Sequence, residues 1–253
     1  MSVLRLTELI CETGTFLLTI SHWEARAGEF SVLLGRNGAG KSTMLKAIAG
    51  DLPCTGERVL HGRLVEKWDP LDRARHMAVL PQASDLHFAF QAEDVVALGA
   101  MPLQMGWREL NKAIRNAMAD ADCADLAGKP YPQLSGGEKQ RIHFARVLLQ
   151  LTQAQKSPLL LLDEPTSAQD LKQQHKLLGQ VTELCRQYDY TAIAVLHDLN
   201  QALRYSDQCT LIENGRVVIE GVPEQVLTPD LVHTTWDYPA KYAITSEAKK
   251  LIY

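Results

Sequence analysis

The stretch FSVLLGRNGAGKSTMLKAIAG, residues 30–50, decides the fold. It begins with a compact apolar segment, FSVLL, which favours a buried β-strand. GRNGAGKS, residues 35–42, follows directly and matches the phosphate-loop pattern G-x-x-x-x-G-K-[ST] in the strand-to-helix context that this pattern requires. After it, apolar residues recur at helical spacing as far as Gly50, a typical helix end. The sequence therefore predicts a strand, a glycine loop and a helix around a bound phosphate.

Each residue type in this loop has a chemical task. Glycines let backbone N–H groups face the β-phosphate, and Lys41 places a point charge on the β and γ oxygens. The Ser42 hydroxyl is suited to ligate Mg²⁺. We therefore expect a nucleoside triphosphate with Mg²⁺, held by the whole loop: Gly35, Arg36, Asn37, Gly38, Ala39, Gly40, Lys41, Ser42 and Thr43.

LLLLDE, residues 159–164, supplies the second half of the predicted site. Asp163 ends a strand that is apolar on both faces, where a carboxylate is costly unless it faces a cation. Its expected role is therefore to hold Mg²⁺ indirectly. Glu164 points elsewhere and is the candidate base that orients and polarises the attacking water. The alternative, an ordinary acidic turn after a strand, is weakened by the presence of the glycine loop.

Two more polar residues follow apolar strands. His197 ends AIAVLHD, and the carboxyl ends of parallel strands open onto the ligand crevice, so we expect it to hydrogen-bond the γ-phosphate. Gln82 follows VLP and is expected to reach the metal and the water. Either residue alone would more often be structural, and only its place at a strand end favours a catalytic role.

QLSGGEKQR, residues 133–141, predicts a second anion site. Ser135 can cap a helix, Gly136 and Gly137 bare the backbone N–H groups, and the helix dipole adds positive potential. A chain with one phosphate loop has no second phosphate of its own to occupy this site.

Composition restricts the class of protein. The chain has 253 residues, of which 46% are hydrophobic and 22% charged, as in a globular domain with a subdomain. The net charge of −4 argues against nucleic acid as a partner. No signal peptide is visible, and the longest apolar run, LLLL at residues 159–162, is far below the roughly 20 residues of a membrane span. Because the five cysteines are odd in number and lack CxxC spacing, we expect reduced thiols and neither a disulfide framework nor a zinc site.

The remaining pattern indicates the arrangement of elements. Short β segments joined by turns are expected up to residue 34, and the stretch from Asp94 to Leu126 is helical in pattern. CTLIENGRVVIEG, residues 209–221, predicts a hairpin with Asn-Gly at its turn. Strands that alternate with helices imply a mostly parallel sheet, so the expected class is α/β.

Taken in order, GRNGAGKS, Gln82, LSGGEKQ, LLLLDEPTSAQD and His197 resemble the ATP-binding subunit of ABC transporters over nearly the whole chain. The resemblance implies a P-loop NTPase core, an N-terminal antiparallel β subdomain and an inserted helical subdomain. We place all of these in one domain, 1–253. The core takes 1–83 and 154–253, and the helical subdomain with the signature motif takes about 84–153.

The same resemblance implies roles and partners. Asp163 is the Walker B carboxylate, Glu164 the catalytic one and His197 the switch histidine, while Gln82 relays nucleotide state to membrane subunits. Two copies bind head to tail, so that Ser135, Gly136 and Gly137 complete the partner's ATP site and Asp170 contacts the neighbour. The homodimer is expected to dock on two permease subunits as a peripheral protein at the cytoplasmic face of the inner membrane. A periplasmic substrate-binding protein is an indirect partner.

A finer resemblance concerns the cargo. Residues 67–90, KWDPLDRARHMAVLPQASDLHFAF, and VVALG after them are similar to the bacterial haem-importer ATPases, within the importer type that also carries siderophores and cobalamin. We therefore expect haem import, with a siderophore or cobalamin importer as the alternative. A soluble ABC protein acting on DNA or ribosomes and a non-hydrolysing nucleotide binder are further alternatives. A soluble ABC protein of this kind usually needs two nucleotide domains in one chain, and this sequence shows one. A non-hydrolysing binder conflicts with the presence of Glu164 and His197.

Three features depart from the family pattern. Arg36 stands inside the glycine loop where proline is common, and we expect no consequence from it. Gln169 stands where leucine is usual, which predicts a wetter dimer contact. The aromatic residue that stacks on adenine has no clear counterpart: Leu9, Ile10 and Cys11 occupy its approximate region, and Phe16 and Trp23 are poor substitutes by position.

Overall fold

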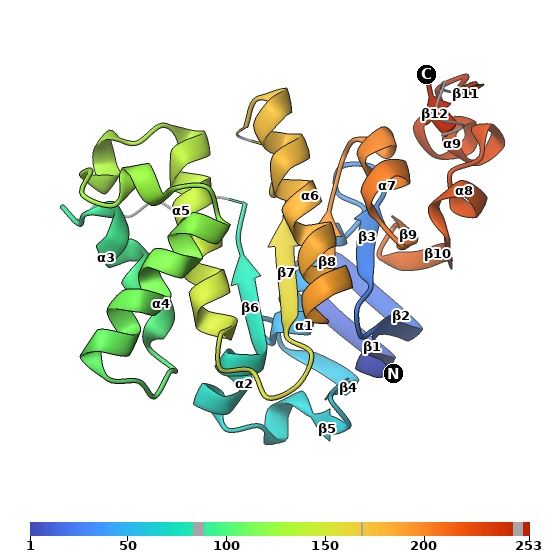
Figure 1. Ribbon diagram of the computed structural model, residues 1–253. Helices are drawn as coiled ribbons and strands as arrows, with labels where there is room; N and C mark the ends of the chain where they lie inside the picture. The colour runs from blue at the N-terminus through green and yellow to red at the C-terminus, as the bar shows by residue number, and fades with distance from the viewer. Residues whose placement is uncertain (83–88, 168, 245–249) are drawn as a thin grey trace.

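A computed structural model describes residues 1–82, 89–167, 169–244 and 250–253 (Figure 1). In this part of the chain, one ten-stranded sheet runs in the order β5-β4-β1-β2-β10-β9-β3-β8-β7-β6. Its strands are β1 (Ser2–Thr13), β2 (Phe16–Arg26), β3 (Phe30–Leu34), β4 (Cys54–Leu60), β5 (Arg63–Leu64), β6 (Met77–Leu80), β7 (Leu159–Asp163), β8 (Thr191–Val195), β9 (Gln208–Glu213) and β10 (Arg216–Gly221).

The parallel part of the sheet positions the site. β3 pairs in parallel with β8 and β9, and β7 pairs in parallel with β8 and β6. Every residue of β3, β7 and β8 is buried, as expected for parallel strands that are covered on both faces. The carboxyl ends of these strands therefore meet at one edge, which brings together the residues that follow them.

Helices cover the two faces of this sheet. α6 (Leu171–Tyr188) and α7 (Leu199–Tyr205) lie on one face, and α1 (Lys41–Ala49) lies on the other (Figure 1). Alternate residues of β7 point into the two cores, Leu160 and Leu162 with α6, and Leu159 and Leu161 with α1. This alternation follows from the two-residue period of a strand and explains why the whole strand is apolar.

The helical part lies beyond β6, at the side of the sheet (Figure 1). It contains α3 (Ala92–Ala97), η2 (Leu98–Ala100), α4 (Trp107–Asp120), η3 (Ala124–Leu126), η4 (Tyr131–Gln133) and α5 (Gly136–Leu151). The predicted fold class, an α/β core with an antiparallel N-terminal part and inserted helices, is confirmed. The predicted boundary at residues 83 and 84 lies outside the described residues.

The N-terminal strands differ from the expectation of short segments. β1 and β2 have 12 and 11 residues and pair antiparallel along most of their length. The β1–β4 register shifts between Thr7 and Ile10, opposite Gly56. A Cβ on Gly56 would lie 2.1 Å from the carbonyl oxygen of Glu8, so only glycine fits there.

Two cysteines correct the prediction of reduced thiols. Cys11 in β1 and Cys54 in β4 are direct register partners, with Cα atoms 4.3 Å apart, and form a disulfide. Sheet pairing brings together residues that are 43 positions apart in the chain, which cysteine counting could not reveal. Cys123, Cys185 and Cys209 are free and buried, and burial raises the pKa of each thiol to about 12.

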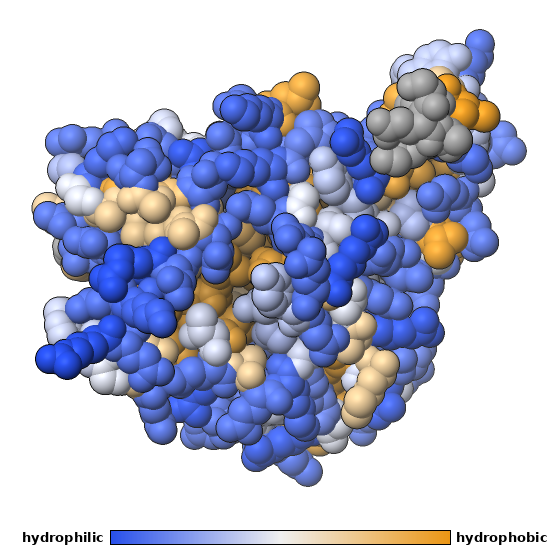
Figure 2. Space-filling model, in the orientation of Figure 1, coloured by the Kyte–Doolittle hydropathy of each residue, from blue (hydrophilic) through white to orange (hydrophobic). Residues whose placement is uncertain are grey.

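The remaining elements complete the structure. β9 and β10 form the predicted hairpin, with Asn214 (φ 48°) and Gly215 (φ 74°) at its turn. None of the helices in the described part is long and apolar enough to span a bilayer. The face in Figure 2 is mostly hydrophilic, with apolar side chains in the hollow between the helical part and α6. Also present are η1 (Val65–Lys67), α2 (Pro70–His76), α8 (Pro223–Val226), α9 (Pro229–Trp236), and a separate pair of strands, β11 (Tyr242–Ile244) and β12 (Lys250–Ile252).

Candidate active site

A cavity of about 680 Å³ opens where the carboxyl ends of the parallel strands meet the first turn of α1. It combines residues from five separate segments of the chain, most of which the sequence had singled out. The lining residues are Phe16, Asn37, Gly38, Gly40, Lys41, Ser42, Thr43, Gln82, Glu164 and His197.

The glycine loop is shaped by backbone conformations that disfavour a side chain. Gly35 has φ 145°, and a Cβ there would lie 2.2 Å from the carbonyl oxygen of Ile212. Gly40 has φ 109° and precedes α1, which has no side-chain cap and no acidic residue in its first turn. The N-terminal N–H groups of α1 are therefore left for an anionic ligand, and the helix dipole favours one.

Lys41 folds back over this loop. Its Nζ donates to the carbonyl oxygens of Gly35 (2.9 Å) and Arg36 (3.0 Å). The side chain is only 5% exposed, and burial lowers the pKa of Lys41, although the nearby carboxylates of Glu164 and Asp163 partly offset this. A buried ammonium held by carbonyls alone gains most from a partner of opposite charge, such as a phosphate oxygen.

Asp163 and Ser42 form the candidate cation site. Ser42 Oγ donates to Asp163 Oδ1 over 2.8 Å, which joins the end of β7 to the start of α1. Burial, with a contribution from Glu164, raises the pKa of Asp163, while the bond from Ser42 lowers it. A hydroxyl beside a buried carboxylate is an oxygen donor set that suits Mg²⁺, which usually takes few protein ligands together with phosphates and waters.

Glu164 is held from two sides. His197 Nε2 lies 2.7 Å from Glu164 Oε1, and Gln82 Nε2 donates to Glu164 Oε2 over 2.6 Å. The backbone of Glu164 has φ 48°, a conformation that non-glycine residues rarely adopt outside functional sites and turns. The structure thus brings three predicted catalytic residues into contact, although they come from three different strand ends.

Phe16 lines the cavity, although the sequence analysis judged it poorly placed. It begins β2, directly after the turn at Gly14, and a Cβ on Gly40 would lie 2.7 Å from its Cζ. The hairpin therefore places an aromatic ring beside the phosphate loop, and the prediction that Phe16 is poorly placed is wrong. Leu9, Cys11 and Trp23 are buried, and Trp23 Nε1 donates to Thr210 Oγ1 over 3.0 Å.

Several predicted loop residues lie just outside this cavity. Arg36 and Ala39 line an adjacent one of about 410 Å³, together with Asn37 and Gly38. Gly35 contributes to the shape of the loop and lines neither cavity. Asp163 reaches the site through Ser42.

Comparison with known proteins decides the family. The model of the ABC transporter family matches residues 18–167, which is more than half of the chain. This chain belongs to the ABC transporter family. It is an ABC transporter ATPase, in which ATP hydrolysis is coupled to transport.

Relatives and solved structures agree with this assignment. The hemin import ATP-binding protein HmuV of Shewanella denitrificans is 48% identical over 226 residues, which cover 89% of each chain. An inward-facing ABC transporter assigned to the metal-chelate type shares the fold, with TM-score 0.82, 23% identity, and coverage of 100% of this chain and 96% of that one. An ATP-binding cassette in a dimeric, post-hydrolysis state with ADP and Pi has TM-score 0.74, 25% identity, and coverage of 87% and 98%.

The signature segment of this ABC ATPase lies at a different helix. Ser135 caps α5, and its Oγ accepts a bond from Glu138 N over 3.4 Å. Glu138 Oε2 in turn accepts bonds from Ser135 N (2.9 Å) and Ser135 Oγ (2.8 Å), and these bonds hold the pKa of Glu138 below its usual range. Ser135, Gly136 and Gly137 do not line the cavity beside Lys41.

The segment before α6 of this ABC ATPase is also apart from the cavity. Asp170 caps α6, and its Oδ1 accepts a bond from Gln173 N over 2.9 Å. The side-chain amide of Gln169 is buried within this chain, and the wetter dimer contact stays a prediction. Ala168, between them, lies outside the described residues.

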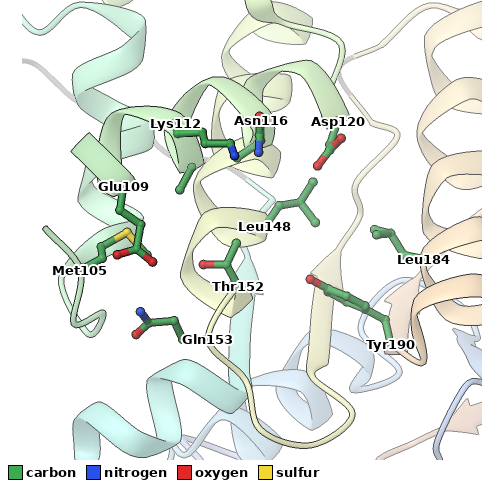
Figure 3. A pocket seen from close by; sticks show the side chains of 12 residues that line it. Met105, Glu109, Lys112, Asn116, Asp120, Leu148, Thr152, Gln153, Leu184 and Tyr190 are labelled. Carbon is green, nitrogen blue, oxygen red and sulfur yellow. The ribbon is translucent and has the colours of Figure 1, made fainter. Parts of the chain in front are cut away.

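A further cavity of this ABC ATPase, about 350 Å³, lies between α4, the end of α5 and α6 (Figure 3). Leu148 and Leu184 line it with Asp120 and Tyr190, and burial raises the pKa of Asp120 and, to about 12, that of Tyr190. Tyr190 precedes β8, so this cavity opens at the edge of the sheet opposite to His197.

Proposed function

We propose that this chain is the ATP-hydrolysing subunit of a bacterial hemin importer. The observation that carries the hydrolytic part is Glu164, which His197 and Gln82 hold beside the phosphate loop. Support for hemin as the cargo comes from similarity: the relative from Shewanella denitrificans, 48% identical, is a hemin import ATP-binding protein. The cavity binds ATP and has no feature that would select hemin, because the cargo does not enter this subunit.

The first step is binding of the triphosphate. The phosphates lie at the open N-terminus of α1, where loop N–H groups donate to them, and Lys41 exchanges its carbonyl partners for β and γ oxygens. Phe16 stacks on the adenine, since its ring borders the loop. Ser42 and Asp163 would hold Mg²⁺, which neutralises charge on the phosphates when it is bound.

The second step is attack by water on the γ-phosphate. The Glu164 carboxylate accepts a hydrogen bond from the water and orients it in line with the bond that breaks. His197 leaves Glu164 to donate to the γ-phosphate, and Gln82 leaves it to donate to the water. Gln82 would also help Ser42 and Asp163 to hold Mg²⁺. Both residues touch Glu164 before ATP binds, so each is already within reach of the reacting atoms.

The complete site needs a second copy. Ser135, Gly136 and Gly137 are outside the cavity of their own chain, and they serve the γ-phosphate bound to a partner in a head-to-tail homodimer. A related cassette is known in a dimeric state with ADP and Pi, which supports this arrangement. Asp170, at the start of α6, contacts the neighbour across the same interface.

The dimer docks on two permease subunits at the cytoplasmic face of the inner membrane and works with a periplasmic binding protein. The division into a core (1–83 and 154–253) and a helical subdomain (about 84–153) allows the two half-sites to close on ATP and reopen after hydrolysis. This movement drives import.

The test is uptake of radiolabelled hemin by bacteria in which the gene for this chain is deleted. Wild-type protein is expected to restore uptake, whereas Glu164→Gln restores less than about 1% of it, since a positioned base contributes roughly 10²–10⁴-fold. Uptake of a ferric siderophore and of cobalamin is measured in the same strains. Siderophore or cobalamin uptake that depends on the chain, with hemin uptake unchanged, overturns the cargo, and full activity of Glu164→Gln overturns the base.

A further inference from the structure

Two loops present the candidate catalytic pair, and each runs directly into a helix. Glu164 begins the segment that leads to α6, and His197 is followed by Asp198, the N-cap of α7. At the front of these loops the two side chains meet, with His197 Nε2 2.7 Å from Glu164 Oε1. That contact must break and re-form in each turnover, so it cannot by itself hold the loops at a fixed separation.

A second connection joins the same loops from behind. Gln201, in the first turn of α7, donates from Nε2 to Gln174 Oε1, in the first turns of α6, over 2.8 Å. Gln174 Nε2 then donates to two carbonyl oxygens of the loop before α6, those of Thr166 (3.1 Å) and Gln169 (3.0 Å). The amide of Gln174 therefore bridges the α7 side chain and the backbone of the Glu164 loop.

Both ends of this bridge are fixed to the residues that carry the chemistry. The carbonyl oxygen of Glu164 accepts bonds from Ser167 N (3.2 Å) and Ser167 Oγ (3.0 Å), which closes the loop into a tight turn. On the other side, Asp198 Oδ1 accepts the backbone N–H of Gln201 over 3.1 Å. Hydrogen bonds and short backbone segments thus connect the Glu164 loop through Gln174 and Gln201 to Asp198, the residue next to His197.

The burial of Gln201 indicates that the bridge is part of the helix packing and not an exposed surface contact. Its side chain is 4% exposed and lies beside Ala202 on the buried face of α7, a position that an apolar residue would fill at lower cost. The α6–α7 packing does not depend on this amide alone, because His175 Nδ1 and Tyr205 Oη also join the two helices over 2.8 Å. Among the side-chain hydrogen bonds between α6 and α7 in the described residues, the glutamine bridge is the one that also touches the loop after Glu164.

We propose that Gln174 and Gln201 are positioning residues for ATP hydrolysis, which fix the Glu164 loop relative to the His197 loop. The inference rests on the proposed function and names a new part of that site. The bridge keeps the distance between the Glu164 and His197 loops constant while the contact between the two side chains opens for the γ-phosphate. Because an error of about 1 Å in such a geometry can cost roughly 10²-fold in rate, we expect about a tenfold loss of kcat when the bridge is removed.

The experiment compares Gln201→Met, Gln174→Met and the double variant in the assembled transporter, with phosphate release measured over a range of ATP concentrations. Each single variant is expected to lower kcat about tenfold and to change KM for ATP less than twofold. The two losses do not add, since one bridge is removed in each case. The double variant regains thermal stability, because replacing both partners with apolar groups can be neutral, but it does not regain kcat.

Tyr205→Phe is the matched control, because it removes an α6–α7 hydrogen bond that does not touch the Glu164 loop. It is expected to keep kcat within twofold of wild type. A double variant that recovers kcat together with stability, or a Tyr205→Phe loss as large as that of Gln201→Met, overturns the positioning role. Failure of the function itself is distinct, since Glu164→Gln in the same assay then retains full turnover.

Discussion

Two helices of this ABC ATPase, α1 and α5, begin at a glycine-rich segment suited to phosphate, but their N-terminal caps differ. α1 follows Gly40 with no side-chain cap and no acidic residue in its first turn. α5 follows Ser135 with a complete capping box, in which the Glu138 carboxylate accepts bonds from the N–H and the hydroxyl of Ser135. The first helix end lacks a partner within its own subunit, and the second already has one.

Under the proposed function, this difference separates a helix end that binds phosphate within its own chain from one that serves a phosphate bound to a second chain. The N–H groups of α1 and the buried Lys41 gain stabilisation directly when a phosphate arrives. At α5, Ser135 already bonds to Glu138, so under the proposed function we expect phosphate to bind there only when a second subunit presents it. We therefore expect variants of the two ends to affect different measurements.

The largest effect is expected for Lys41→Met, which removes the buried charge beside the loop. A hydrogen bond to a charged group contributes about 1.5–3 kcal/mol, so ATP binding to the isolated chain should weaken about 10- to 100-fold. Calorimetric titration of the purified chain measures this. Lys139→Met, in the first turn of α5, is the matched control and should leave binding by the isolated chain unchanged. Equal losses in the two variants would remove the distinction between the helix ends.

The next effect is expected for Ser135→Ala, which removes the hydroxyl at the second helix end. ATP binding by the isolated chain should persist, while phosphate release by the assembled transporter falls about tenfold, the loss expected for one charge-assisted bond. Loss of an N-cap also costs about 1 kcal/mol in stability. Thr228→Ala, which removes a similar cap from α9, controls for that cost and should leave turnover unchanged. Normal turnover of Ser135→Ala would mean that α5 contributes nothing to the reaction.

A smaller effect is expected for Glu138→Gln, which makes the two helix ends more alike. Without the carboxylate, α5 has no negative charge to compete with phosphate, so half-maximal turnover should need about threefold less ATP. The bonds from Ser135 lower the pKa of Glu138 in the folded chain, so the carboxylate stabilises the fold above its ordinary pKa. That contribution is lost as pH falls through the lowered pKa. The difference in Tm between wild type and Glu138→Gln should therefore begin to shrink as pH falls below the ordinary glutamate pKa of about 4.3, and should disappear below the lowered pKa.

The smallest effect is expected for Asp163→Asn, which tests whether the buried carboxylate beside α1 lowers the stability of the fold. Burial raises the pKa of Asp163, so its ionisation opposes folding above the ordinary pKa of an aspartate. Without nucleotide at pH 7, Asp163→Asn should therefore raise Tm, by about 2–4 °C for each kcal/mol gained in a chain of this size. The gain should disappear in acid, where wild-type Asp163 is protonated. An unchanged Tm at pH 7 would show that the buried carboxylate is already compensated.

The local sequence was sufficient to predict some of these features but not others. The strand–loop–helix at residues 30–50, the cap at Ser135 and the Asn-Gly hairpin all depend on neighbours in the chain, and the structure contains each of them. Phe16 and the Cys11–Cys54 pair depend instead on how β1 pairs with β2 and β4. Such pairing is set by the whole sheet, so it could not be predicted from the spacing of these residues in the sequence.

Glu164, His197 and Gln82 lie between these two cases. Their positions at strand ends were readable, because parallel strands share an edge, and this predicted that they would converge. The Gln174–Gln201 bridge could not be read, since a glutamine in a helix usually faces water and neither residue belongs to a motif. Tertiary packing alone reveals that one of them is buried.

The capping box at α5 has a consequence for cells that make more of this protein than they can assemble. In the proposed homodimer, Ser135 of a lone subunit would stay hydrogen-bonded to Glu138, so a single copy would not complete a site for hydrolysis. Surplus subunits would then not hydrolyse ATP, and the cell would not consume ATP while the permease is scarce.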